Sequence, residues 1–275
     1  MTDWDPDFDV EKERADCHAF LTGVHAGEAP GEWIGDVPEH WGEVMFGGSI
    51  IGQSITALTR DVPDDRRLNS IHGYFVRPTT GGVPITYVIT SVREGRNFST
   101  RRWTAAQRGK TIFEGIASFT ADTDGYVYDL PHTSEVAPRP EPDGFGVAGF
   151  EAAFLGWTEQ RADGTYESTD RKWFRMPVDI GDDVHLHTAY MGFASDWTGI
   201  GSRPLLLNWE QEEYGIASLD HALWFHRPAR VTDWHLSDLH CLVNFGGRSQ
   251  VRSTIRNDAG EVVVSMAQEL LVKKF

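Results

Sequence analysis

The chain has 275 residues, of which 40% are apolar and 24% charged, an ordinary balance for a soluble globular protein of one or two domains. Its 25 basic and 41 acidic residues give a formal net charge of −16, which argues against nucleic acid or an anionic membrane as a partner. Cys17 and Cys241 lie far apart, which excludes a disulfide framework and a thiolate metal site.

Residues 1–43 are interpreted as an N-terminal extension. They begin with an acidic stretch, MTDWDPDFDVEKERAD, which lacks the apolar core of a signal peptide. Nowhere does an apolar run approach the ~18–20 residues of a membrane-spanning helix. We therefore expect a cytoplasmic protein without a membrane partner.

A helix followed by four strands is predicted over residues 44–120. The helix follows Phe46-Gly47-Gly48-Ser49, and its apolar residues recur at helical spacing between positions 50 and 58. Breaks at proline and glycine separate four strand-like runs, which lie near 68–77, 84–94, 98–108 and 110–120.

The second half repeats this layout after a linker at residues 121–149, which is rich in proline and glycine. We predict a second unit over residues 150–275, with an opening strand at 171–180 and a helix near 186–198. Four further strands follow, near 216–227, 234–245, 249–257 and 261–273.

Sequence landmarks recur between the two halves at an offset of 150 or 151 positions. Residues 74–78 read YFVRP and residues 224–228 read WFHRP, and the turn at Gly109 parallels that at Gly260. A helix followed by an antiparallel meander suggests a sheet wrapped around that helix. Two such units can join edge to edge, which hides strand edges that would otherwise aggregate.

One polar residue interrupts the apolar face of the last predicted strand. Its alternate positions are Val262, Val264, Met266, Gln268, Leu270 and Val272. Burying an unpaired carboxamide costs roughly 1–3 kcal/mol. Because the first copy carries Ala117 at the matching place, the fold does not need the glutamine. We therefore expect Gln268 to have a function.

Several motifs resemble the type II acyl-CoA thioesterases. The first half has MFGG at 45–48, IHGYFVRP at 71–78 and RNFSTRR at 96–102; the second has FASD at 193–196, LDHALWFHRP at 219–228 and AQE at 267–269. The resemblance covers roughly residues 44–120 and 171–273. It implies the α+β double hot-dog fold, two tandem antiparallel sheets that each wrap a central helix and join edge to edge.

The resemblance also implies an activity, the hydrolysis of acyl-CoA to a free acid and CoA, with no cofactor beyond the CoA of the substrate. The family's hydrolytic residues fall on Asp196, Ser218 and Gln268. Asp196 would take a proton from a water that the other two hold in line with the thioester carbonyl. Relatives often carry threonine at the hydroxyl position, so Ser218 is a mild departure.

Further positions are second-rank candidates. His72 lies in a shared motif, and the backbone N–H groups of Gly47 and Gly48 at a helix start are suited to an oxyanion. In a chain of charge −16, the CoA phosphates require a local concentration of positive charge. The candidates are Arg77, Arg96, Arg101, Arg102, Arg227 and Arg248.

Two other functions stay open: a hot-dog hydratase or dehydratase with a His–Asp pair facing the acyl chain, and a catalytically silent acyl-CoA-binding protein. No metal is predicted, because His185 and His187 lack a third ligand at convincing spacing. The GxGxxG at 144–149 follows the linker rather than a strand, and no GxSxG is present. Further pairing into a homo-oligomer, acyl chain length and pathway are left open.

Overall fold

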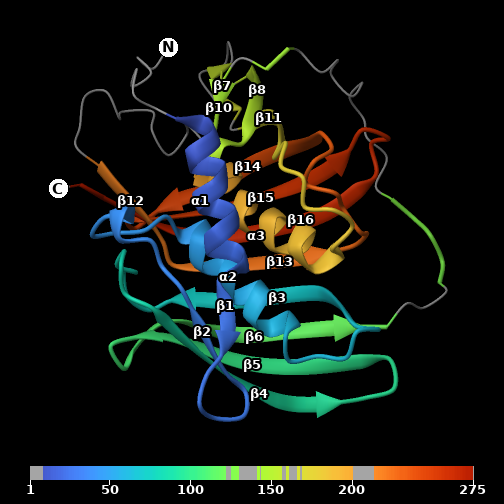
Figure 1. The fold of residues 1–275 in the computed structure, drawn as a ribbon. Coiled ribbons are helices and arrows are strands. Elements are labelled where there is room, and N and C mark those ends of the chain that lie inside the picture. Colours follow the sequence, from blue (N-terminus) through green and yellow to red (C-terminus); the bar gives the residue numbers. More distant parts are fainter. Residues whose placement is uncertain are drawn as a thin grey trace.

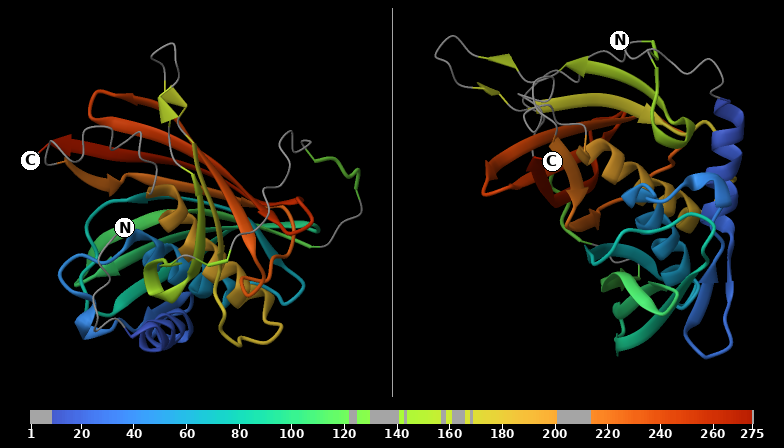
Figure 2. Two further views of the ribbon diagram at one scale, coloured as in Figure 1. Left: turned by 90° about the horizontal axis from the view of Figure 1, so that it is seen from above. Right: turned by 90° about the vertical axis from the view of Figure 1, so that its left-hand side faces the viewer.

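The computed structural model describes residues 9–121, 125–129, 141–142, 144–156, 159–160, 166–167, 169–200 and 214–274. A large antiparallel sheet wraps around two helices, α2 (Gly47–Thr59) and α3 (Val184–Ile200), as Figures 1 and 2 show. Both helices are almost completely buried. The core therefore lies between the helices and the inner face of the sheet.

The sheet has two halves that meet in the middle. From the outer edge inward, the first half consists of β1 (Val24–Ala26), β2 (Glu32–Gly35), β4 (Ile85–Glu94), β5 (Phe98–Gln107), β6 (Lys110–Thr120) and β3 (Arg67–Phe75). The second continues with β13 (Asp220–Phe225), β16 (Val262–Lys274), β15 (Arg248–Asn257), β14 (His235–Phe245), β11 (Thr169–Arg175), β8 (Glu151–Gly156) and β7 (Gly144–Phe145).

The halves join where β3 pairs with β13, antiparallel, with His72 opposite Ala222. The repeated landmarks take equivalent places: Phe75 and Phe225 end the two joining strands. Gly109 and Gly260 lie in the β5–β6 and β15–β16 turns, both with positive φ, 71° and 80°. This pairing is the edge-to-edge junction that the repeat predicted.

The predicted strand at 216–227 is divided. It forms β12 (Tyr214–Ser218) and β13, which both pair with β16, but the pairing shifts by one residue around Leu219. Ser218 is opposite the buried Leu270 on one side of the shift, and Ala222 is opposite Ala267 on the other. Because of the shift, Ser218 and His221 face the same side of the sheet, although three positions separate them.

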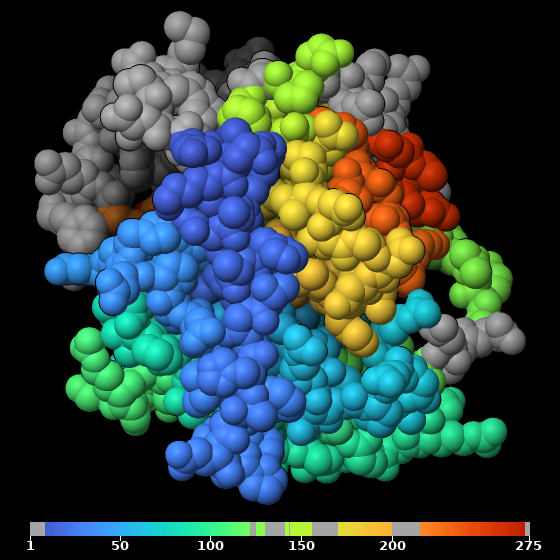
Figure 3. All heavy atoms as spheres, viewed as in Figure 1, coloured from blue at the N-terminus to red at the C-terminus, as the bar shows by residue number. Residues whose placement is uncertain are grey.

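The N-terminal region is part of the fold rather than an addition to it. Helix α1 (Val10–Thr22) buries Cys17, Phe20 and Leu21, and Figure 3 shows the segment lying across one face of the molecule. The side chain of Gln53 in α2 donates to the backbone oxygens of Phe20 (2.7 Å) and Asp36 (3.0 Å). Sequence patterns showed only an acidic start here and missed the buried face of α1.

Smaller elements complete the description. A 3₁₀ turn covers Glu39–Trp41, a second covers Val147–Gly149, and β9 (Glu159–Gln160) pairs with β10 (Tyr166–Glu167) outside the main sheet. Of the predicted linker, residues 122–124, 130–140 and 143 lie outside the described part of the chain. The opening strand predicted at 171–180 corresponds to β11, which ends at Arg175.

Candidate active site

Three polar side chains from different elements meet in the second half of the sheet. The Ser218 hydroxyl donates to Asp196 Oδ1 at 3.0 Å, and Gln268 Nε2 donates to the same oxygen at 2.7 Å. Gln268 Nε2 also lies 2.7 Å from Ser218 Oγ. The structure thus brings Asp196, Ser218 and Gln268 within contact of one another.

Each residue reaches the cluster for a local reason. Asp196 lies in the last turns of α3, on the side that packs against the sheet, and is fully buried. Gln268 projects from the inner face of β16, in line with the buried Met266 and Leu270. Ser218 ends β12, and the one-residue pairing shift that follows it gives this hydroxyl its inward direction.

The N-terminus of α2 closes the cluster from one side. A Cβ built on Gly47 would lie 2.8 Å from Asp196 Oδ2, and one built on Gly48 would collide with the Phe193 backbone oxygen and the Phe46 ring. A larger residue at Gly48 would collide with the α3 backbone, and one at Gly47 would displace the Asp196 carboxylate or the Phe75 ring. The glycines therefore let the positive end of the α2 dipole approach the carboxylate.

The environment of Asp196 changes its proton affinity. Complete burial raises the pKa of this carboxyl to about 6, against the opposing effects of hydrogen bonds from Gln268 and Ser218 and, more weakly, of the Gly48 backbone N–H. Asp196 Oδ2 is buried, and the Gly48 N–H near it does not reach normal hydrogen-bond geometry, so this oxygen has no well-formed hydrogen bond within the described residues. A carboxylate with a pKa near neutrality is suited to act as a general base.

His221 is a fourth polar residue at the cluster, and sequence reasoning assigned it no role. It is 2% exposed, its Nε2 lies 2.8 Å from Ser195 Oγ, and its Nδ1 lies 3.9 Å from Asp196 Oδ1. Burial lowers the pKa of this imidazole to about 3, so the ring is neutral. The signal that found Gln268 was also present here, a polar residue in an alternating stripe with Leu223 and Phe225.

His72 lies away from the cluster. In β3 the buried positions are Leu68, Ile71 and Gly73, whereas His72 projects from the opposite, outer face, where its ring meets Trp224 edge-on at 4.8 Å. Burial lowers the pKa of the histidine, and the nearby Asp220 acts in the opposite sense. His72 therefore does not contact Asp196.

The six candidate arginines differ in exposure and in their partners. The side chains of Arg77, Arg96, Arg102 and Arg248 are exposed. Arg227 is half-buried and pairs with Asp129 at 2.8 Å.

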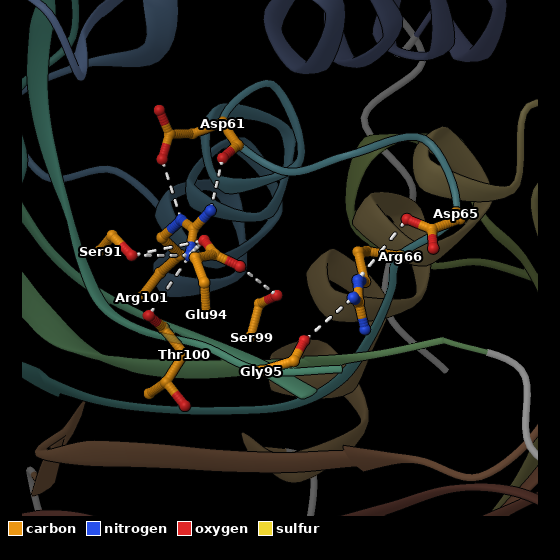
Figure 4. A network of polar contacts seen from close by, with 9 residues as sticks. All are labelled: Asp61, Asp65, Arg66, Ser91, Glu94, Gly95, Ser99, Thr100 and Arg101. Carbon is orange, nitrogen blue, oxygen red and sulfur yellow. Dashed lines mark hydrogen bonds and ion pairs between the residues drawn. The ribbon is translucent and has the colours of Figure 1, made fainter. Parts of the chain in front are cut away.

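Arg101 does not fit the expected phosphate-binding role. It is 3% exposed, donates from Nε to Asp61 at 2.9 Å and also pairs with Glu94, as Figure 4 shows. Its charge is neutralised inside the first half of the sheet, so Arg101 is not available to a phosphate.

Metal ligands and membrane segments can be assessed for the described residues. They contain no group of three or more His, Cys, Asp or Glu that could hold a metal ion. His187 instead accepts from the Val231 backbone N–H at 3.2 Å and contacts the Gly181 oxygen at 3.0 Å. None of the described helices is long and apolar enough to cross a membrane.

Family models match both halves of the chain. The model of the acyl-CoA thioesterase N-terminal domain matches residues 37–120, and that of the C-terminal domain matches residues 131–272. The chain therefore belongs to the acyl-CoA thioesterase family, and the resemblance noted in the sequence is confirmed.

Individual relatives agree with this assignment. The chain is 26% identical to acyl-CoA thioesterase 2 of Haemophilus influenzae, over 83% of this chain and 87% of that protein. It is also 26% identical to human acyl-coenzyme A thioesterase 8, over 83% and 80% of the two chains.

Solved structures show the same architecture. Acyl-CoA thioesterase II TesB2 of Mycobacterium marinum aligns with a TM-score of 0.78 at 28% identity, covering 94% of this chain and 97% of that chain. An Alicyclobacillus acidocaldarius protein described as having a hot dog fold aligns with a TM-score of 0.68 at 15% identity, over 93% and 97%. The fold is therefore a hot-dog fold.

Proposed function

We propose that this chain hydrolyses acyl-CoA thioesters to a free carboxylic acid and CoA, using a water activated by Asp196, Ser218 and Gln268. The observation that carries the proposal is the convergence of these three side chains, with polar atoms 2.7–3.0 Å apart, beside the N-terminus of α2. We also infer a double hot-dog organisation, with units over 44–120 and 150–275 and a linker over 121–149.

The water enters on the side of Ser218, the half-buried member of a cluster in which Asp196 and Gln268 are fully buried. A water that donates to Ser218 Oγ loses its proton through the serine hydroxyl to Asp196 Oδ1, which already accepts from that hydroxyl. Gln268 Nε2 holds the serine and aspartate oxygens in place. The base then acts at the moment the water attacks the carbonyl carbon.

Attack places negative charge on the thioester oxygen. The N-terminus of α2 supplies the positive end of a helix dipole to this oxygen, with the Gly47 backbone N–H as the donor, because the Gly48 N–H faces Asp196. When the carbon–sulfur bond breaks, the CoA thiolate takes up the proton that Asp196 received. Atoms and charge are then balanced without a covalent enzyme intermediate or a cofactor.

The CoA phosphates need cationic partners on an acidic protein. Because Arg101 is occupied, the proposal retains Arg77, Arg96, Arg102, Arg227 and Arg248. Arg248 begins β15 opposite Leu271, three residues along β16 from Gln268, and its own partner is Glu269 at 3.3 Å on the exposed face. An exposed pair of this kind is weak and can be exchanged for a phosphate.

A hydratase is the second candidate, since one observation favours it: His221 Nδ1 lies 3.9 Å from Asp196 Oδ1. In that reaction a His–Asp pair must face the acyl chain. His221, however, is 2% exposed, and its Nε2 is engaged by Ser195. The arrangement therefore favours water activation by the aspartate, with the histidine behind it.

The test is CoA release from a panel of acyl-CoA chain lengths, run in parallel with hydration of an enoyl-CoA followed by loss of its enoyl absorbance. We expect CoA release with at least one saturated acyl-CoA and no hydration. Hydration without release would favour the hydratase. Tight binding of acyl-CoA with neither reaction would favour a silent binding protein.

A further inference from the structure

Besides Asp196 Oδ2, two buried polar atoms at the site have no hydrogen bond within the described residues: His221 Nδ1 and Gln268 Oε1. The register of β13 and β16 pairs Ala222 with Ala267. Extended by one residue, it sets His221 opposite Gln268 on the inner face. Side chains at such paired positions are in direct reach of each other. An orphaned donor or acceptor at 1–2% exposure is costly, so a pairing between these two atoms is favoured.

The tautomer of His221 decides whether the two atoms can pair. The Ser195 hydroxyl has one proton and two acceptors within reach, the Gly192 oxygen at 2.7 Å and His221 Nε2 at 2.8 Å. If the proton points to Gly192, His221 carries its hydrogen on Nε2, and Nδ1 and Gln268 Oε1 are two acceptors facing each other. If it points to His221, Nδ1 carries the hydrogen and donates to Oε1.

With the hydrogen on His221 Nδ1, both ring nitrogens of His221, the Ser195 hydroxyl and Gln268 Oε1 all have hydrogen-bond partners. The Gly192 oxygen lies inside α3, where the helix supplies its own donor. The carboxamide of Gln268 acts on the His221 ring in the sense expected of an acceptor beside an N–H, although burial outweighs it and the pKa of His221 stays near 3. The imidazole is therefore neutral and can donate from Nδ1 without carrying charge into the site.

Gln268 has little freedom to turn over. A Cβ built on Gly199 would collide with Gln268 Oε1, so the carboxamide oxygen is seated against the α3 backbone. Turning the amide by half a rotation would place Oε1 against Asp196 Oδ1, where Nε2 now donates at 2.7 Å, and would set two acceptors in contact. In this orientation Gln268 Oε1 lacks a donor within the described residues, and an N–H on His221 Nδ1 would supply one and hold the amide from the opposite side.

We propose that His221 is a positioning residue, which donates from Nδ1 to Gln268 Oε1 and thereby keeps Gln268 Nε2 directed at Asp196 and Ser218. Ser195 sets the required tautomer from behind. This inference rests on the proposed water-activating role of Gln268. It adds the residues that hold Gln268 in place: His221, which contacts Gln268, and Ser195, which contacts His221.

Three substitutions of His221 distinguish the role of its Nδ1 from that of its Nε2. His221→Asn keeps an N–H donor near the place of Nδ1, His221→Gln places its amide near Nε2, and His221→Leu has neither. We expect kcat to fall roughly tenfold or more in the Gln and Leu variants and to stay within about threefold in the Asn variant, with KM unchanged in all three. Equal kcat values in the Asn and Gln variants would overturn the proposal.

A matched control is His235, which is 1% exposed and contacts the Asp233 oxygen through Nδ1 at 2.9 Å, away from the cluster. His235→Leu should lower the melting temperature without lowering kcat. This control measures the general cost of removing a buried imidazole from the same sheet.

The decisive measurement is a double-mutant cycle. If His221 acts through Gln268, His221→Leu should cause no further loss of kcat in a Gln268→Leu background. Losses that multiply, or full activity of His221→Leu alone, would overturn the positioning role. Full activity of Gln268→Leu would instead refute the proposed catalytic site, so failure of that site and failure of this inference give different results.

Discussion

The two halves of the sheet can be compared at four inner positions that strand pairing makes equivalent. In the first half these positions are held by Leu68, Ile71, Arg101 and Ala117; in the second they are held by Ser218, His221, Val251 and Gln268. The first set is apolar except for one arginine. The second set is polar except for one valine.

Each half also places a carboxylate near the end of its helix, and the partners differ. Asp61, just after α2, is neutralised by the Arg101 guanidinium, which also contacts Glu94 and the Asp61 backbone oxygen (Figure 4). Asp196, near the end of α3, has no lysine or arginine partner within the described residues and is held by the neutral donors of Ser218 and Gln268. A carboxylate paired with a cation stabilises the fold; one held by neutral donors with a pKa of about 6 can accept a proton.

The comparison explains why we place the proposed site in the second half of the sheet. The backbone of both copies offers the same inner positions, and the irregular pairing that turns Ser218 inward has a counterpart between Leu68 and Ser70 in β3. The chemistry therefore differs through side chains alone.

The largest effect is expected at the two carboxylates. Asp196→Ala should reduce kcat by about 10²–10⁴-fold, because it removes the base that acts in the transition state. Asp61→Ala should leave kcat unchanged and lower stability. CoA-release kinetics and thermal melts of both variants give the comparison; comparable losses of activity would mean that the halves are not functionally distinct.

The next contrast is between two buried glutamines. Gln268→Leu should reduce turnover by roughly tenfold or more while stability holds or rises by about 1 kcal/mol, because leucine suits the stripe of Met266 and Leu270. Gln53→Leu should have the reverse effect: turnover should be unchanged and stability should fall. It leaves the Tyr87 hydroxyl, now 2.9 Å from Gln53 Oε1, and two backbone oxygens unpaired at a cost of about 1–3 kcal/mol. A fully active Gln268→Leu enzyme would remove the main support for the site.

The dependence of kcat/KM on pH should follow the ionisation of Asp196. Asp196 must be ionised to accept a proton, so kcat/KM should fall about tenfold per pH unit below about 6 and level off above it. Chromatographic measurement of CoA release between pH 5 and 8 would show this. The profile should be unchanged in Asp61→Ala.

The free energy of unfolding should change with pH in the opposite direction to activity: it should fall as Asp196 ionises. Because folding raises the pKa of Asp196 from 3.8 to about 6, the ionised carboxyl penalises the folded state, increasingly between pH 4 and 6 and fully above that. Asp196→Asn should therefore stabilise the protein at pH 7–8, by up to about 3 kcal/mol, and have little effect at pH 4. A gain that is independent of pH would assign the effect to packing instead.

A smaller effect is expected at the first-half cation. Arg101→Met should destabilise the protein by about 1–3 kcal/mol, because Asp61 and Glu94 lose their partner but remain partly hydrated. The kcat and the KM for acyl-CoA should be unchanged. Urea unfolding measures the first quantity, and a raised KM would show that Arg101 serves the substrate after all.

The smallest effect is expected for Ser218→Thr. The hydroxyl is retained and the added methyl restricts its rotamer, so kcat should stay within about threefold of the parent enzyme. Ser218→Ala serves as the control, since it removes the group that relays the water proton and should lose at least tenfold. If the alanine variant keeps full activity, the proton does not pass through Ser218.

Local patterns were sufficient to predict most of the strands and both central helices. Proline and glycine breaks bounded the runs that form β4, β5 and β6, helical spacing identified α2 and α3, and alternation identified the inner face of β16. The same argument singled out Gln268 as a polar residue in an apolar stripe. Repetition of landmarks then predicted that two units join edge to edge, and in the structure β3 and β13 are the strands that meet.

Contacts between distant segments were decided only by the tertiary structure. The outward direction of His72, the pairing of Arg101 with Asp61 and Glu94, and the place of His221 behind Gln268 all depend on which strand lies beside which and in what register. The one-residue shift around Leu219 is the clearest case, because it turns Ser218 to the side of His221 and no local pattern announces it. A sequence specifies which faces are buried, whereas register across strands fixes which buried groups meet.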